Sequence, residues 1–338
     1  MKAIRVKRIA RELGFDRLRI VRAGPVRNAR YYRDWLAAGY AGSMRYLHRN
    51  TDCRADSSHI LPGARSIICA ALSYRRATEK DRLPSRVAAR TAGGTAGVGM
   101  PPAVPTGRVA QYVRGPDYHL VLRQRLGVLV DHMRAEIDEP FDARVCVDTA
   151  PLLERELAAA AGVGWIGKNT LVIDPALGSF LFLGEVVSTL ELAPDEPATD
   201  HCGTCTRCLD ACPTRALVAP YQMDASRCIS YLTIEHRGEI PADLRDGIGE
   251  WVYGCDVCQD VCPFNAKAPP AHDAEIVREY IPSRLELPQL ARLTPGDYKR
   301  LVRGTAAGRA TRAMWQRNAE IALRNGAERS AGTPSNAT

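Results

Sequence analysis

The chain has 338 residues, of which 46% are hydrophobic, and a formal net charge of +8. This length predicts two or three domains, and the composition is that of a globular protein. No apolar run of about 18 residues is present, so no transmembrane helix is expected. No apolar segment follows the charged start at 1–8, so neither a secretory nor a twin-arginine signal is expected, and we predict a cytoplasmic protein.

The first half of the chain alternates predicted helices and strands. Apolar periodicity predicts helices over residues 2–13 and 31–38, and short apolar runs predict strands over 18–21 and 66–72. The segment 77–107 is rich in Gly, Ala, Pro and Arg and has no periodicity. We therefore interpret it as a surface insertion.

A long amphipathic helix is predicted over residues 117–139. Its apolar face is expected to contain Leu120, Leu126, Leu129, Val130 and Met133. The elements expected after it are a strand, a helix and two strands, over residues 143–147, 151–161, 171–174 and 180–190. This alternation predicts an α/β sheet domain over residues 1–195.

Asp148 is the first candidate functional residue. It stands at the end of a predicted strand and directly before a predicted helix. Ligands of α/β sheets bind beyond the carboxyl ends of the strands, which favours a general acid in a cleft. The alternative is a carboxylate that caps the helix three residues later.

Eight of the eleven cysteines lie between residues 202 and 262. The first four follow the bacterial ferredoxin spacing C-x2-C-x2-C-x3-C-P, in which the fourth cysteine of each run ligates the other cluster. We therefore predict two [4Fe-4S] clusters. The first is assigned to Cys202, Cys205, Cys208 and Cys262. The second is assigned to Cys212, Cys228, Cys255 and Cys258.

Two alternatives to iron–sulfur clusters remain for these cysteines. Two C-x2-C pairs also occur in structural zinc sites, although three cysteines at two-residue gaps followed by Cys-Pro are typical of clusters. A disulfide framework is disfavoured by the length of the chain and the absence of a recognisable secretory signal. We predict a ferredoxin-like domain over residues 196–268.

The last segment, 269–338, is predicted to be helical and basic. Between residues 292 and 329 nine arginines and lysines face three acidic residues, a net charge of +6. One interpretation is a solvated helical face. The other is a surface that contacts the phosphates of a nucleic acid.

Several segments together resemble one known family, the cobalamin-dependent epoxyqueuosine reductases. They are GPDYH (115–119), DTAPLLERELA (148–158), GVGWIGKNTLVI (162–173), GSFLFLGE (178–185), CGTCTRCLDACPTRAL (202–217), RCISYLTIEHRGEIP (227–241) and YGCDVCQDVCPFN (253–265). The resemblance extends over most of residues 2–325. The chain departs from the family in the insertion at 77–107 and in a C-terminus shorter than a full HEAT-like helical module.

The resemblance implies an α/β core that binds cobalamin, like that of the reductive dehalogenases, beside the two-cluster domain. The implied reaction reduces the epoxide of epoxyqueuosine in tRNA to queuosine, the last step of queuosine biosynthesis. Electrons from an unidentified low-potential donor pass through the clusters to cobalamin, and Asp148 is the implied proton donor. We expect a monomer that does not associate with membranes.

The resemblance also implies roles for individual residues. Candidate cobalamin contacts are Arg54, Tyr112, Asp148, Val172, Ser230 and Asp256. Candidate contacts to the modified base are Leu153, Glu154 and Arg155. Candidate phosphate contacts in the basic segment are Arg303, Arg309, Arg312 and Arg317.

Three rival functions share part of this pattern. A reductive dehalogenase also combines cobalamin with two clusters, but lacks the text RCISYLTIEHRG. An extended ferredoxin would carry electrons without catalysis, although the long α/β region argues for a pocket. An RNA-binding protein could hold clusters for stability alone. Cobalamin content separates the first interpretation from the last two, and a substrate assay separates it from the dehalogenase.

Overall fold

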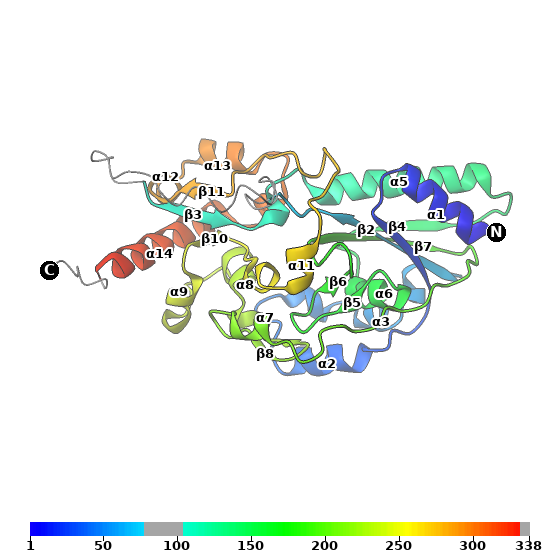
Figure 1. The fold of residues 1–338 in the computed structure, drawn as a ribbon, viewed down its shortest axis with the longest axis horizontal. Helices are drawn as coiled ribbons and strands as arrows, with labels where there is room; N and C mark the ends of the chain where they lie inside the picture. Colours follow the sequence, from blue (N-terminus) through cyan, green and yellow to red (C-terminus); the bar gives the residue numbers. More distant parts are fainter. Residues whose placement is uncertain (78–103, 332–338) are drawn as a thin grey trace, which may run out of the picture.

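The computed structural model describes residues 1–77 and 104–331. The predicted insertion at 77–107 lies mostly outside these residues. One end of the elongated molecule holds a four-stranded sheet in the order β1-β2-β7-β4, and the long helix α14 (Arg312–Ala331) lies at the other end (Figure 1). The strands of this sheet are β1 (Arg17–Arg22), β2 (Ser66–Ser73), β7 (Leu181–Ser188) and β4 (Ala143–Cys146).

Helices cover both faces of this sheet and bury its central strands. α1 (Lys2–Glu12) and α5 (Tyr118–Glu136) pack on one face, and α6 (Glu154–Ala161) packs on the other (Figure 1). The predicted α/β core is confirmed, but each strand pair in this sheet is antiparallel. The rule for the carboxyl ends of parallel strands therefore does not explain the position of Asp148.

Two details of the predicted helices are wrong. Leu120 is 61% exposed, and Leu122 is buried in its place. Leu120 precedes Leu126 by six residues, which is about 240° around a helix, whereas Leu122 precedes it by four residues, or about 40°. α6 begins at Glu154 instead of residue 151, because the preceding residues form a turn closed by backbone hydrogen bonds.

The remaining elements around this sheet are short. They are the helices α2 (Ala29–Ala37) and α3 (Thr51–Ala55), the 3-10 helices η1 (Arg45–His48), η2 (Ser57–Ile60) and η3 (Gln111–Val113), and the hairpin strands β5 (Trp165–Ile166) and β6 (Val172–Ile173). The predicted strands at 171–174 and 180–190 correspond to β6 and β7.

The cysteine-rich part consists of short helices and strands between loops. Its elements are α7 (Arg207–Asp210), β8 (Leu217–Ala219), β9 (Gln222–Met223), η4 (Ala225–Arg227), α8 (Ile229–Ile234), α9 (Ala242–Ile248), β10 (Trp251–Tyr253), α10 (Val257–Asp260) and α11 (Pro263–Lys267). In sequence, α8 and α9 occupy the long interval between Cys228 and Cys255.

A second sheet joins three distant parts of the chain. β3 (Thr106–Val109) pairs in parallel with β10 and antiparallel with β11 (Arg284–Glu286). This sheet therefore takes one strand from each of the three predicted domains, and the predicted boundaries at 195 and 268 remain predictions. Among the described residues, no helix is both long and apolar enough to cross a membrane.

The C-terminal helices pack on this second sheet. They are α12 (Leu287–Ala291), α13 (Pro295–Val302), the 3-10 helix η5 (Ala306–Arg309) and α14. Trp315 of α14 stacks on Tyr253 of β10 with ring centres 4.8 Å apart. The buried Asn318 amide donates to the carbonyls of Thr233 and Val252. α14 thus belongs to the same core as the strand that leads into the last three cluster cysteines.

Candidate active site

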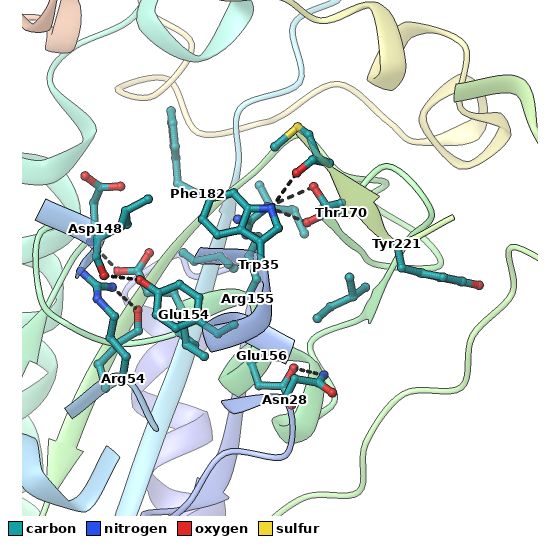
Figure 2. Close-up of a pocket in the computed structure, with 18 of the residues that line it drawn as sticks. Asn28, Trp35, Arg54, Asp148, Glu154, Arg155, Glu156, Thr170, Phe182 and Tyr221 are labelled. Carbon is teal, nitrogen blue, oxygen red and sulfur yellow. Dashed lines mark hydrogen bonds between the residues drawn. The ribbon is translucent and has the colours of Figure 1, made fainter. Parts of the chain in front are cut away.

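A cavity of about 690 Å³ opens between the first sheet, α6 and α2. Its wall is rich in aromatic side chains, namely Tyr31, Tyr32, Trp35, Tyr74, Tyr112, Tyr118, Phe182 and Tyr221. Polar side chains enter it from the loop before α6 and from α6 itself, including Asp148, Glu154 and Arg155 (Figure 2). A concave, mostly apolar wall with a few converging polar groups is typical of cofactor and substrate sites.

Asp148 lies in the loop that joins β4 to α6. Its φ of +54° is in the left-handed region, which is uncommon for a residue other than glycine and is a feature of functional sites. Its side chain is 53% exposed and its Oδ2 lies 3.2 Å from His119 Nε2. Its backbone N–H donates to Glu154 Oε1. The loop thus presents the Asp148 carboxyl to the cavity.

His119 connects Asp148 to the start of α5. Its Nδ1 lies 2.7 Å from Asp117 Oδ1, so both ring nitrogens contact carboxylates. Burial lowers the pKa of His119, but the hydrogen bonds to Asp117 and Asp148 outweigh it and raise that pKa to about 9. The imidazole is therefore protonated at neutral pH. The sequence analysis gave His119 no role. Asp117, two residues earlier at the predicted helix start, was the signal that a carboxylate would lie beside the imidazole.

Glu185 is a second residue of this region that was not predicted from the sequence. It lies on β7 with 0% of its surface exposed, next to the partly buried Glu154. Burial and the neighbouring Glu154 charge raise the pKa of Glu185 well above its ordinary value. The signal in the sequence was a glutamate inside an apolar strand, where an unpaired charge is costly.

The cavity brings together part of the predicted cobalamin set. Arg54, Tyr112 and Asp148 line it. Arg54 donates to the carbonyl of Leu152 at 3.3 Å, while its buried Nε has no hydrogen-bond partner among the described residues. All three predicted base contacts, Leu153, Glu154 and Arg155, also line the cavity.

The other three predicted cobalamin contacts lie outside the residues that line the cavity. Val172 is buried in the core beneath α6. Asp256 is buried, and its carboxylate accepts a hydrogen bond from the backbone N–H of Gln111 at 2.8 Å. Ser230 lies on α8, and its carbonyl accepts a hydrogen bond from the Thr233 hydroxyl at 3.3 Å.

None of the eleven cysteines is in a disulfide. Burial raises the pKa of the Cys262 thiol, and the nearby thiols of Cys202 and Cys205 raise it further. Burial also raises the pKa of the Cys208 thiol, and the same two thiols raise it further. Cys262, directly before α11, therefore meets the first cysteine run in space, although they are far apart in sequence.

The remaining four cysteines form a second set. Burial raises the pKa of the Cys258 thiol well above its usual range, and the thiols of Cys228, Cys255 and Cys212 add to this effect. Among the described residues, no group of three or more His, Cys, Asp or Glu side chains is arranged to hold a single metal ion. A [4Fe-4S] cluster binds its four cysteines through four separate irons and requires no such close group.

The basic C-terminal arginines differ in their surroundings. Arg303 is exposed at the end of α13. Arg309 pairs with Glu235 at 2.7 Å and lies over the Tyr46 ring, beside a hollow of about 370 Å³. Arg312 donates to the Leu293 carbonyl at 3.0 Å.

The hydrogen bonds of Arg317 within the chain argue against the predicted phosphate contact. Its guanidinium donates to the carbonyls of Leu232, His236 and Gly238, and to the Asn318 side chain. These bonds occupy all the N–H groups of an arginine. Arg317 therefore ties α14 to α8 and the loop after it.

The fold and this site define an iron–sulfur protein with paired cysteine quartets beside a cofactor-sized pocket. Residues 201–265 match the family profile described as 4Fe-4S double cluster binding domain, and residues 54–149 match that of epoxyqueuosine reductase QueG. An epoxyqueuosine reductase of Xanthomonas campestris is 39% identical, over 96% of this chain and 86% of the relative. The chain belongs to the epoxyqueuosine reductase family.

Two solved structures are similar to the whole described fold. One is a crystal structure of epoxyqueuosine reductase with an epoxyqueuosine-modified tRNA-Tyr stem loop, with a TM-score of 0.82, 31% identity and coverage of 96% of this chain and 82% of that one. The other is epoxyqueuosine reductase from Bacillus subtilis with its catalytic loop swung out of the active site. It has a TM-score of 0.80, 30% identity and the same coverage.

Proposed function

We propose that this protein reduces the epoxide of epoxyqueuosine in tRNA to the cyclopentene of queuosine. The reaction consumes two electrons and two protons and releases water. The observation that carries the proposal is the contact between Asp148 and the protonated His119 at the wall of the aromatic cavity. An epoxide oxygen that leaves carbon needs a proton, and this pair has one available at neutral pH.

Asp148 is the proposed proton donor. The proton of His119 Nε2 passes through Asp148 Oδ2 to the epoxide oxygen as its C–O bonds break, and the second proton of the released water comes from solvent. Asp117 holds the other side of the imidazole ring and supports its positive charge. The negative charge that develops on the oxygen is thereby neutralised inside the cavity, where water is partly excluded.

The residues around the cavity fit a large, flat cofactor such as cobalamin. The aromatic walls suit an apolar macrocycle, and the unpartnered Nε of Arg54 suits an amide or phosphate at its periphery. When bound there, cobalamin supplies the low-valent cobalt that performs the reductive step. Arg54 and Tyr112 would hold it from the cavity wall, with Val172, Ser230 and Asp256 kept as proposed contacts.

The eight cysteines are proposed to hold two [4Fe-4S] clusters. The first set is Cys202, Cys205, Cys208 and Cys262, and the second is Cys212, Cys228, Cys255 and Cys258. The electrostatic contacts among the thiols fall within these two sets, which supports the assignment. The electron donor is proposed to be a low-potential carrier, and the monomeric state and cytoplasmic location remain predictions.

The tRNA is proposed to lie across the cavity mouth and the basic face of the C-terminal segment. Leu153, Glu154 and Arg155 line the cavity and are the proposed contacts to the modified base. Arg303, Arg309 and Arg312 are the proposed phosphate contacts. Binding that neutralises phosphates weakens as salt rises.

The proposed function is tested by anaerobic conversion of tRNA that carries epoxyqueuosine. The protein is supplied with reconstituted clusters, cobalamin and a strong reductant, and the tRNA is digested to nucleosides for mass spectrometry. We expect the modified nucleoside to lose one oxygen atom. If the epoxide persists although clusters and corrin are bound, the substrate assignment is wrong and the dehalogenase alternative gains support.

A further inference from the structure

Glu185 occupies the middle of a row that crosses the first sheet. The strand register pairs it with Cys69 of β2 on one side and with Cys146 of β4 on the other. Both cysteines belong to the core cluster that packs against α6, and each is at most 2% exposed. The Glu185 carboxyl therefore lies beneath α6, in surroundings that are otherwise apolar.

Within residues 1–77 and 104–331, no cation acts on the Glu185 carboxyl. Neither oxygen of Glu185 meets a hydrogen-bond donor among the described residues. The groups that act on Glu185 itself are Glu154 on α6 and Asp148 in the loop. Cys69 and Cys146 flank it in the row, Arg144 and Arg123 act on Cys146, and Arg155 acts on Glu154. Burial raises the pKa of both thiols, so neither thiol carries charge.

The neighbour within hydrogen-bonding reach of Glu185 is the carboxyl of Glu154. Two carboxylates cannot bond to each other, whereas a protonated carboxyl donates well to a carboxylate. Burial and the nearby Asp148 charge also raise the pKa of Glu154. One proton shared between the two carboxyls therefore gives Glu185 a hydrogen-bond partner, and no cation is needed.

Glu154 connects this pair to the catalytic loop. Its Oε1 accepts the backbone N–H of Asp148, as Figure 2 shows. Asp148 is held in the left-handed region at φ +54°, a conformation that costs free energy and needs support from its surroundings. An acceptor with negative charge holds that N–H more strongly than a neutral one.

We propose that Glu154 and Glu185 form a proton-sharing carboxyl pair that positions the Asp148 loop over the cavity. This role rests on the proposed function, because it serves the proton donor of that reaction. Both glutamates are positioning residues in it. The protonated Glu185 carboxyl donates a hydrogen bond to the Glu154 carboxylate, and Glu154 also accepts the backbone N–H of Asp148.

The pair predicts a specific pH dependence of the loop. Both carboxyl pKa values are raised in the folded protein, so both carboxyls are protonated at low pH. One proton is shared once Glu154 ionises near its pKa of about 7, and that proton is lost as pH rises further through the raised pKa of Glu185. Two carboxylates then repel each other, and the support of the Asp148 N–H weakens. The loop should open more readily on the alkaline side.

The test compares Glu185→Gln and Glu185→Leu with the wild-type protein, all with clusters and cobalamin bound. Glutamine keeps a donor toward Glu154 without a titratable proton, and leucine removes the donor. Cys69→Ala is the matched control, because Cys69 lies beside Glu185 in the same buried row but on β2. Hydrogen exchange of the peptide at 147–153 and single-turnover conversion are measured between pH 6 and 9.

Glu185→Leu should speed exchange of the loop and slow conversion about tenfold, with KM for tRNA little changed, because one hydrogen bond is lost. After correction for intrinsic rates, Glu185→Gln should retain protection of the loop on the alkaline side, where wild-type protein loses it, because the variant has no shared proton to lose. Cys69→Ala should behave as wild type. If Glu185→Leu fails to retain its clusters, the exchange profile of Glu185→Gln decides.

Two results would overturn the inference. One is wild-type loop protection in Glu185→Leu, and the other is an unchanged pH profile of exchange in Glu185→Gln. Exchange needs no substrate, so it tests the pair even if the tRNA conversion assay fails. A wild-type protein that converts no tRNA would instead contradict the proposed function.

Discussion

Replacing Asp117 with asparagine removes one carboxylate from His119 while leaving the start of α5 capped. Asp117 Oδ1 contacts His119 Nδ1 at 2.7 Å and also accepts the His119 backbone N–H at 3.0 Å. Asparagine is as good an N-cap as aspartate, so the helix should remain. The change therefore isolates the charge that supports the imidazolium.

The expected magnitude follows from the pKa of His119. Raising that pKa from its ordinary 6.5 to about 9 corresponds to about 3 kcal/mol in favour of the imidazolium. Two carboxylates share this effect, and Asp117 makes the shorter contact. Burial still lowers the pKa of His119 in the variant, so losing Asp117 removes at least half of the net shift, and at about pH 8.5 the protonated fraction falls roughly fivefold or more.

The assay is single-turnover conversion of modified tRNA between pH 6 and 10. Because the folded-state pKa of His119 is raised, the imidazolium is fully present below pH 6.5 and is lost as pH rises through about 9. The rate of wild-type protein should fall near that pH, and that of Asp117→Asn should fall more than one pH unit lower. Asp131→Asn, on the exposed side of α5, is the control.

One result would refute this reasoning about His119. If wild-type protein and Asp117→Asn lose activity at the same pH, the protonation of His119 does not limit the reaction. Wild-type conversion that stays flat up to pH 10 would lead to the same conclusion. His119 would then hold Asp148 in place without supplying a proton.

Three further changes test other parts of the account. Asp148→Asn should slow conversion by about 10²- to 10⁴-fold with unchanged iron content, and full turnover would exclude it as proton donor. Cys262→Ala should lower bound iron from about eight atoms per chain toward about four, whereas Cys146→Ala should retain all of it, and equal losses would contradict the assignment. Arg309→Ala should weaken tRNA binding and reduce its salt dependence by about one phosphate contact, while Arg317→Ala should lower thermal stability and leave the salt slope unchanged. A salt-independent dissociation constant for the wild-type protein would argue against the basic surface.

Local patterns predicted much of the fold, because they depend on neighbouring residues. The apolar run at 66–72 predicted β2, and periodicity predicted α1 and α5 to within a few residues. The spacing of the cysteines separated them into the two sets that meet in space. Each of these signals resides in a short stretch of sequence.

Features that depend on contacts between distant segments escaped prediction. The antiparallel order of the first sheet and the pairing of β3 with β10 and β11 are set by tertiary packing. Arg317 looked like a phosphate contact because charge counts ignore the carbonyls that surround it. Glu185 and His119 gained meaning only when the fold placed them next to Glu154 and Asp148.

The most direct test of the central claim is the cobalamin dependence of tRNA conversion. Purified protein with about eight irons per chain is assayed anaerobically with a strong reductant, with and without cobalamin. The account predicts that the epoxyqueuosine nucleoside loses one oxygen atom only when cobalamin is present. Conversion without cobalamin would contradict the cofactor assignment, and no conversion with verified clusters and bound corrin would contradict the proposed substrate.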